Sequence, residues 1–210
     1  MAEQLPAELF ERVDDSDDAL FYVAPRLVAH IDEATIAALT QYYAEVLAPG
    51  ARVLDLMSSW ISHLPKTVFA HVAGLGMNGD ELDANPRLDR RVVHDLNRDP
   101  TLPFVSAAFD AVLIAVSVQY LTRPVDVFRE IARVLAPGGR VVVAMSHRCF
   151  PTKAVRAFHL LPPAERVRLV GAYLDLAGGF EEIAFVDRSP PNADPLWIVT
   201  AQRAPMESLS

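Results

Sequence analysis

Two hydrophobic patterns meet at Ala48-Pro-Gly-Ala-Arg-Val-Leu-Asp-Leu56. Ahead of this stretch, from Leu27 to Leu47, apolar residues recur with a period near 3.6, which is typical of an amphipathic helix. The proline and glycine at its start end that period. From Arg52 onward the apolar residues form short runs separated by turns. The sequence therefore predicts a helical segment over residues 19–50, followed by a different kind of structure.

Seven short apolar runs come next, each of a length suited to a buried β-strand. They cover residues 52–56, 72–77, 91–94, 111–116, 141–145, 183–186 and 196–200. Helical stretches lie between them, the clearest at 124–135. Alternating strands and helices predict a parallel sheet covered on both faces, which is a doubly wound α/β fold. Residues 188–195 are too few for a helical crossover, so the last two strands are expected to pair antiparallel at an edge.

Composition and charge restrict the class of protein. The chain has 210 residues, 51% of them hydrophobic, which is enough for one domain with a sizeable core. Its net charge is -8 without a cluster of Lys or Arg, which argues against a nucleic-acid partner. A single cysteine and the lack of a signal peptide or apolar span predict a cytoplasmic protein without membrane contact. Its oligomeric state, monomer or homodimer, is left open by the sequence. We expect an acidic, flexible leader at 1–18 and an α/β core at 51–202.

Three later motifs follow in a fixed order. Leu102-Pro-Phe104 leads into the fourth run, residues 133–143 read Arg-Val-Leu-Ala-Pro-Gly-Gly-Arg-Val-Val-Val, and Gly178-Gly-Phe180 precedes the sixth run. Together with residues 48–56, these motifs resemble the class I S-adenosylmethionine-dependent methyltransferases of the type 11 kind, over residues 48–202. The resemblance implies a seven-stranded Rossmann-like sheet whose last strand is antiparallel. It also implies S-adenosylmethionine as cofactor and in-line methyl transfer to a small-molecule acceptor.

The first loop departs from the glycine-rich turn of that family. The corresponding residues are Met57-Ser58-Ser59-Trp60. We expect a short helix after them, limited by Pro65, with Ser58 or Ser59 capping it and offering a hydroxyl to the carboxylate of the cofactor. The stretch 58–65 also resembles a subset of methyltransferase-like proteins in which Ser-Ser-Trp is followed by Ser-His-Xaa-Pro.

The remaining cofactor contacts are implied by the same resemblance. The acidic residue that the family uses to bind the ribose falls at Gly76, so Asn78 is the nearest replacement, with Asp80 and Glu81 behind it. The residues after the third run are expected to bind the adenine. The full set of predicted cofactor residues is Asp55, Met57, Ser58, Ser59, Gly76, Met77, Asn78, Asp95, Leu96, Asn97 and Ser117.

Residues after the fourth and fifth runs are candidates for catalysis, because ligands of such sheets bind beyond the carboxyl ends of the strands. His147 could act as a base and Arg148 could bind a carboxylate, although a His-Arg pair at a strand end is often a surface feature. Tyr120 could face the sulfonium or the substrate, or simply pack under a helix.

The N-terminal segment offers further candidates. Tyr22, Arg26 and His30 could form a lid over the site or could serve only to attach the segment to the sheet. The histidines lack the close spacing of a metal site, so no metal is expected.

Two other classes of function remain open at this stage. One is a methyltransferase-like domain that binds a ligand or partner without catalysis, or that uses the sulfonium cofactor for another reaction. The other is a nicotinamide-dependent oxidoreductase, which the lack of Gly-x-Gly-x-x-Gly disfavours.

Overall fold

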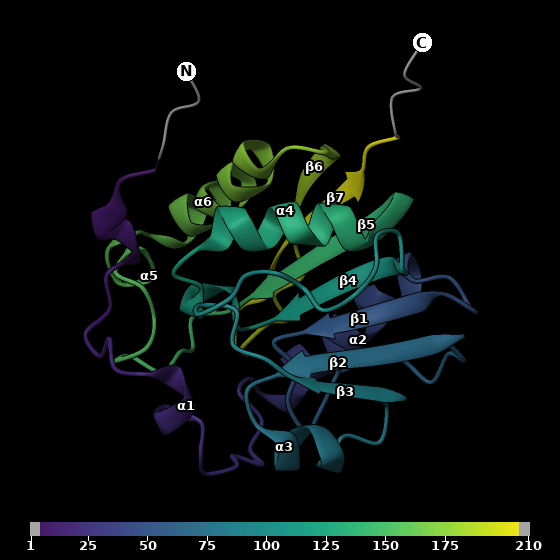
Figure 1. The fold of residues 1–210 in the computed structure, drawn as a ribbon, viewed down its shortest axis with the longest axis horizontal. Helices are drawn as coiled ribbons and strands as arrows, with labels where there is room; N and C mark the ends of the chain where they lie inside the picture. The colour runs from purple at the N-terminus through teal and green to yellow at the C-terminus, as the bar shows by residue number, and fades with distance from the viewer. Residues whose placement is uncertain (1–4, 206–210) are drawn as a thin grey trace.

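A computed structural model describes residues 5–205 and shows one seven-stranded sheet with helices on both faces (Figure 1). The strands are β1 (Arg52–Leu56), β2 (His71–Gly76), β3 (Arg90–Val93), β4 (Phe109–Ala115), β5 (Leu135–Met145), β6 (Phe180–Asp187) and β7 (Trp197–Arg203). The helices are η1 (Ala7–Phe10), α1 (Asp18–Phe21), α2 (Glu33–Val46), α3 (Gly79–Ala84), η2 (Val118–Tyr120), α4 (Pro124–Val134), α5 (Ala157–Leu160) and α6 (Pro163–Ala177).

The strand order is β3-β2-β1-β4-β5-β7-β6. The first five strands in this order run parallel, whereas β7 is antiparallel to both of its neighbours. The predicted doubly wound sheet with an antiparallel last strand is therefore confirmed. The chain crosses from one side of β1 to the other between β3 and β4, and such a switch point leaves a crevice beyond the carboxyl ends of the strands.

Two hydrophobic clusters hold the helices to the sheet. Leu54 and Leu56 belong to the cluster that also contains Phe128 of α4 and Tyr173 of α6. Val53, which points to the opposite face, belongs to the cluster that contains the buried side chains of α2. Alternate residues of β1 thus bury against different layers, as a strand covered on both faces requires. In Figure 1, α4 and α6 lie together on one face and α2 lies behind β1.

The N-terminal helical segment is shorter than the sequence predicts. Residues 22–32 form no helix, and α2 begins only at Glu33. Asp32 caps α2, because its carboxylate accepts a hydrogen bond from the Thr35 amide at 2.9 Å. Pro25 disfavours helical geometry in the residue before it. Leu27 and Val28 continued the apolar period, yet both are exposed rather than part of a buried helical face.

Residues 5–18 also differ from the expected solvated leader. The Lys153 ammonium is fully buried and lies 3.2 Å from the Asp14 carboxylate and 3.1 Å from that of Asp18. Arg12 forms a second ion pair with Asp18, at 2.7 Å. These contacts attach this part of the chain to the body of the domain. Residues 1–4 of the predicted leader lie outside the described residues.

The short helix expected after β1 is absent, since residues 57–70 are irregular throughout. Ser58 and Ser59 therefore cap no helix there. Between residues 5 and 205, no helix is both long and apolar enough to cross a membrane.

Candidate functional site

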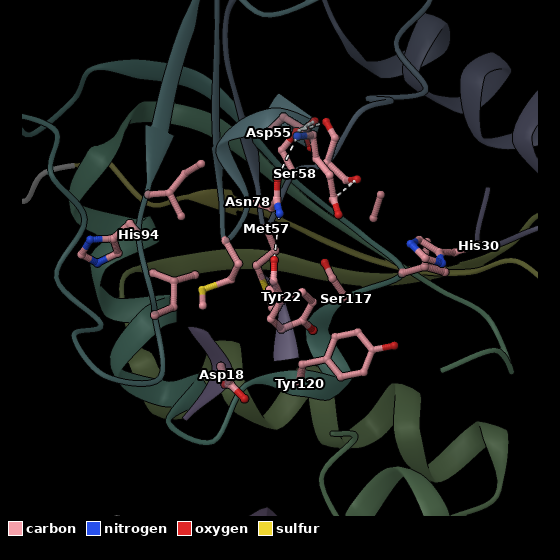
Figure 2. A pocket seen from close by; sticks show the side chains of 18 of the residues that line it. Asp18, Tyr22, His30, Asp55, Met57, Ser58, Asn78, His94, Ser117 and Tyr120 are labelled. Atoms are coloured by element: carbon pink, nitrogen blue, oxygen red, sulfur yellow. Dashed lines mark hydrogen bonds between the residues drawn. The ribbon is translucent and has the colours of Figure 1, made fainter. Parts of the chain in front are cut away.

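A cavity opens beyond the carboxyl ends of β1, β2, β3 and β4, on the side of the sheet where α1 lies (Figures 1 and 2). It encloses about 1050 Å³ including its open mouth. Every residue of the predicted cofactor set lines it. The structure therefore brings together residues that are separated by up to 62 positions in the sequence, from Asp55 to Ser117.

After β1, the first loop extends the hydrogen bonding of the sheet through one residue, Ser58, and then turns away. The Ser58 amide donates to the Leu75 carbonyl at 2.8 Å. Met57 has a φ of 58°, so it adopts the left-handed conformation that glycine adopts most easily. The Ser58 hydroxyl donates to the Asp55 carboxylate at 2.6 Å. Burial raises the pKa of Asp55 to about 6, although this hydrogen bond opposes the shift.

Gly76 has no room for a side chain. A Cβ at this position would lie 2.2 Å from the Ser58 carbonyl oxygen, far inside contact distance. An acidic residue cannot replace Gly76 while the first loop keeps this path. The path of the first loop therefore excludes the acidic side chain that the resemblance implies at this position.

Asn78, the predicted replacement, is occupied by contacts within the protein. Its carbonyl oxygen accepts from the Glu81 amide at 3.0 Å and thereby caps α3. Its amide nitrogen donates to the carbonyls of Tyr22, at 2.8 Å, and Val23, at 3.1 Å. Both donor hydrogens are used, so Asn78 fastens the N-terminal segment across the cavity.

Glu81 brings a carboxylate to the cavity wall. It is buried, accepts from the Ser59 hydroxyl at 2.5 Å, and accepts from the Arg26 amide at 2.7 Å. From the sequence, Glu81 was expected only behind Asn78. The sequence offered one signal for Glu81, which stands three residues after the helix-capping Asn78. At that spacing the side chain of the third helical residue turns back toward the start of the helix.

Beyond β3, the predicted adenine residues form a compact turn. The Asp95 carboxylate accepts from the Asn97 amide at 2.9 Å. The Asn97 side chain donates to Asp18 at 2.8 Å and to the Tyr120 carbonyl at 2.9 Å, and it accepts from the Thr122 amide at 2.8 Å. Asn97 thus joins its own turn to α1 and to the segment from Tyr120 to Thr122.

His147 and Arg148 lie outside the residues that line the cavity. Arg148 forms an ion pair with Asp194 at 2.7 Å, and His147 lies 3.4 Å from the same carboxylate. Both side chains are about half exposed. The geometry favours the surface alternative for this pair.

The N-terminal segment contributes Tyr22 and His30 to the cavity lining. The Arg26 guanidinium instead lies over the Phe21 ring, 4.3 Å from its centroid. The Trp60 indole donates to the Val28 carbonyl at 3.1 Å, which fastens the segment from the first loop. Residues 22–30 therefore cross the cavity, and we call them the strap.

Tyr120 lines the cavity from η2, and its hydroxyl accepts from the Phe150 amide at 2.8 Å. Burial raises its pKa to about 12, so it stays protonated at neutral pH.

His63 is a lining residue that the sequence analysis did not select. It is 8% exposed, and its Nδ1 has no hydrogen-bond partner among the described residues. Burial lowers its pKa to about 4, and burial likewise lowers the pKa of His30. The Ser-His-Xaa-Pro stretch after the first loop was the signal that marked it.

Comparisons with known proteins agree with this architecture. Residues 58–143 match the model of a family described as a methyltransferase domain. The [4+2]-cyclase SpnF is 19% identical, with a TM-score of 0.61 over 80% of this chain and 81% of that one. The fold is that of the class I methyltransferases.

Two more solved structures share this fold. A putative methyltransferase of Haloferax volcanii in complex with the Trm112 activator gives a TM-score of 0.64 at 15% identity, over 84% of this chain and 92% of that chain. Geranyl diphosphate C-methyltransferase from Streptomyces coelicolor gives 0.54 at 15% identity, over 80% and 76%. Among curated proteins, none matches the chain.

No cluster of three or more His, Cys, Asp or Glu side chains suited to a metal ion occurs within residues 5–205.

Proposed function

We propose that this protein is an S-adenosylmethionine-dependent methyltransferase acting on a small-molecule acceptor. One observation carries the proposal: the segment that matches the methyltransferase domain, 58–143, supplies most of the lining of a cavity at the switch point of a class I methyltransferase sheet. Ligands of doubly wound sheets bind at that place.

The charge of the cavity supports a cationic cofactor. Its described lining includes no lysine or arginine but has the carboxylates of Asp55, Glu81 and Asp95, beside that of Asp18, which is ion-paired with Arg12 and Lys153. A sulfonium centre would be favoured in such surroundings. When bound, the cofactor would supply an electrophilic methyl group, and the surrounding protein would hold the acceptor in line with it and exclude water.

The residues present fit most of the cofactor. The hydroxyls of Ser58 and Ser59 donate to Asp55 and Glu81, so their oxygens would accept from the ammonium group at the methionine end of the cofactor. Asp95 and Leu96 would hold the adenine. We assign the ribose to the Glu81 carboxylate, since Gly76 carries no side chain and the amide of Asn78 is engaged. Glu81 reaches the cavity from α3 and replaces the acidic residue at the end of β2.

Calorimetric titration with S-adenosylmethionine and S-adenosylhomocysteine tests the function. Micromolar affinity, about -8 kcal/mol, is expected. Glu81→Gln should weaken binding about tenfold, because it removes the charge while keeping the side-chain length. Asp80→Asn, on the same helix but outside the lining, is the matched control. Absence of binding by the wild-type chain would contradict the proposal.

A second function rests on the glycine-free loop and on the cyclase that shares this fold. A class I sheet can host reactions other than methyl transfer, or binding alone. Cofactor binding without methylated product across a broad acceptor screen would favour this second function.

A further inference from the structure

The buried ring of His63 lacks a hydrogen-bond partner at Nδ1. Leaving a buried polar atom unpaired is unfavourable, and native proteins retain few such atoms. The residue lines the cavity, so a bound molecule can reach this ring. His63 therefore has unused hydrogen-bonding capacity at the wall of the cavity.

His30 and His63 both line the cavity, and the hydrogen bond from the Trp60 indole to the Val28 carbonyl, at 3.1 Å, joins the two stretches of chain that carry them. Figure 2 shows His30 at the end of the cavity opposite to His94, which adjoins the predicted adenine residues. Trp60 and Ile61 also line the cavity beside His63 in the sequence. A cofactor with its adenine near His94 would leave the opposite end of the cavity, which contains His30 and His63, to the acceptor.

The charges at this end restrict the acceptor. Both histidines are neutral at pH 7, because burial lowers their pKa values. The guanidinium of Arg26 stacks on Phe21 and donates to its carbonyl at 2.8 Å, and it is not part of the lining. A phosphate or carboxylate would find no cationic side chain in the described lining and would meet the Glu81 carboxylate.

We propose that His63, assisted by His30, binds an uncharged acceptor through a hydroxyl group on an aromatic or otherwise apolar molecule. A neutral imidazole ring nitrogen accepts the hydrogen bond of that hydroxyl. The aromatic and apolar lining accommodates the remainder of the molecule. This assignment rests on the proposed function, since it takes the opposite end of the cavity to be filled by the cofactor.

The test uses the full chain saturated with S-adenosylhomocysteine and titrated by calorimetry, at pH 7.5, with phenol and with benzoate as its anionic counterpart. Phenol is expected to bind at least about tenfold more tightly than benzoate. His63→Phe should weaken phenol binding about tenfold, because it keeps the ring but removes both nitrogens. His63→Asn should weaken it less than about threefold, because Asn keeps a hydrogen-bonding group and tolerates the φ of 53° at this position.

His159→Phe, at an exposed position on α5, serves as the control and should leave phenol binding unchanged. Equal binding of phenol and benzoate, no binding of phenol, or unchanged phenol affinity in His63→Phe would each overturn the proposal. Should His63→Phe fail to fold, the comparison of the two probes on the wild-type chain and on His63→Asn still decides it. Failure of the proposed function is separate, because it shows as absent S-adenosylhomocysteine binding in the first titration.

Discussion

The two ends of the cavity are built differently. At the Asp95 end, the polar side chains are bonded to one another: Asn97 joins Asp18, Tyr120 and Thr122. At the other end, Nδ1 of His63 has no partner among the described residues. The first arrangement stabilises the fold, whereas the second leaves hydrogen-bonding capacity for a ligand. The cavity therefore contains both residues that stabilise the fold and residues whose hydrogen-bonding groups are left for a ligand.

The largest effect on stability is expected at the Asp95 end of the cavity, where the polar groups are hydrogen-bonded to one another. Lys153→Met removes one of the two cations that pair with Asp18, and breaking a buried pair in this way costs about 4 kcal/mol of unfolding free energy. Urea denaturation measures the loss. Lys66→Met, at an exposed position, is the control and should change stability little. A loss below about 1 kcal/mol would mean that the Asp95 end of the cavity does not depend on this network.

The pH dependence of stability tests Asp55, which lies between the two ends. Its folded pKa is raised to about 6 from an unfolded value of 3.8, so the folded state holds the proton more tightly. The contribution of Asp55 to stability should therefore fall as pH rises through this window, by about 3 kcal/mol in total. The lowered pKa of His63 makes a contribution of opposite sign in both proteins, so the Asp55 contribution is measured as the difference between the wild-type chain and Asp55→Asn in urea denaturation at pH 4 and pH 7. Parallel curves for the two proteins would contradict the assignment.

The tight contact between the first loop and β2 gives a smaller effect. Gly76→Ala forces a methyl group against the Ser58 carbonyl and should cost about 2 kcal/mol. Gly171→Ala is the matched control, because a Cβ there meets nothing within 4 Å and alanine favours the helix α6, so this variant should gain about 0.5 kcal/mol. Thermal unfolding distinguishes the two. Equal melting temperatures would show that the loop moves aside.

The smallest effect on stability is expected at the end of the cavity that contains His63. His63→Asn breaks no hydrogen bond of its Nδ1 within the described protein, and its stability should fall by about 1 kcal/mol or less. The same denaturation assay applies. A loss of several kcal/mol would place His63 among the structural residues and remove the contrast between the two ends.

Local patterns were sufficient for the sheet. Each predicted strand overlaps an observed one, and α4 ends at Val134 within one residue of its predicted end. The short connection at 188–195 indicated the antiparallel last pair of strands, and the resemblance to class I methyltransferases implied the same pairing and supplied the cofactor residues that line the cavity. These features follow from hydrophobic period and motif order, both of which are visible in a single sequence.

Long-range contacts were not predictable in this way. The strap continues the apolar period of α2, yet Asn78 and Glu81 bind its backbone from more than fifty residues away. The first loop lacks a helix because it bonds to β2 instead, through Ser58 and Leu75. Such contacts depend on how the elements meet, which local periodicity does not encode.

The hydrogen bond from Trp60 to Val28 has a practical consequence. The chain has two tryptophans, and the second, Trp197, lies on β7 and outside the cavity lining. Trp60 joins the strap to the cavity wall, so its fluorescence would report both occupancy and any displacement of the strap. Stopped-flow emission of a Trp197→Phe variant could thus time ligand entry without an added dye.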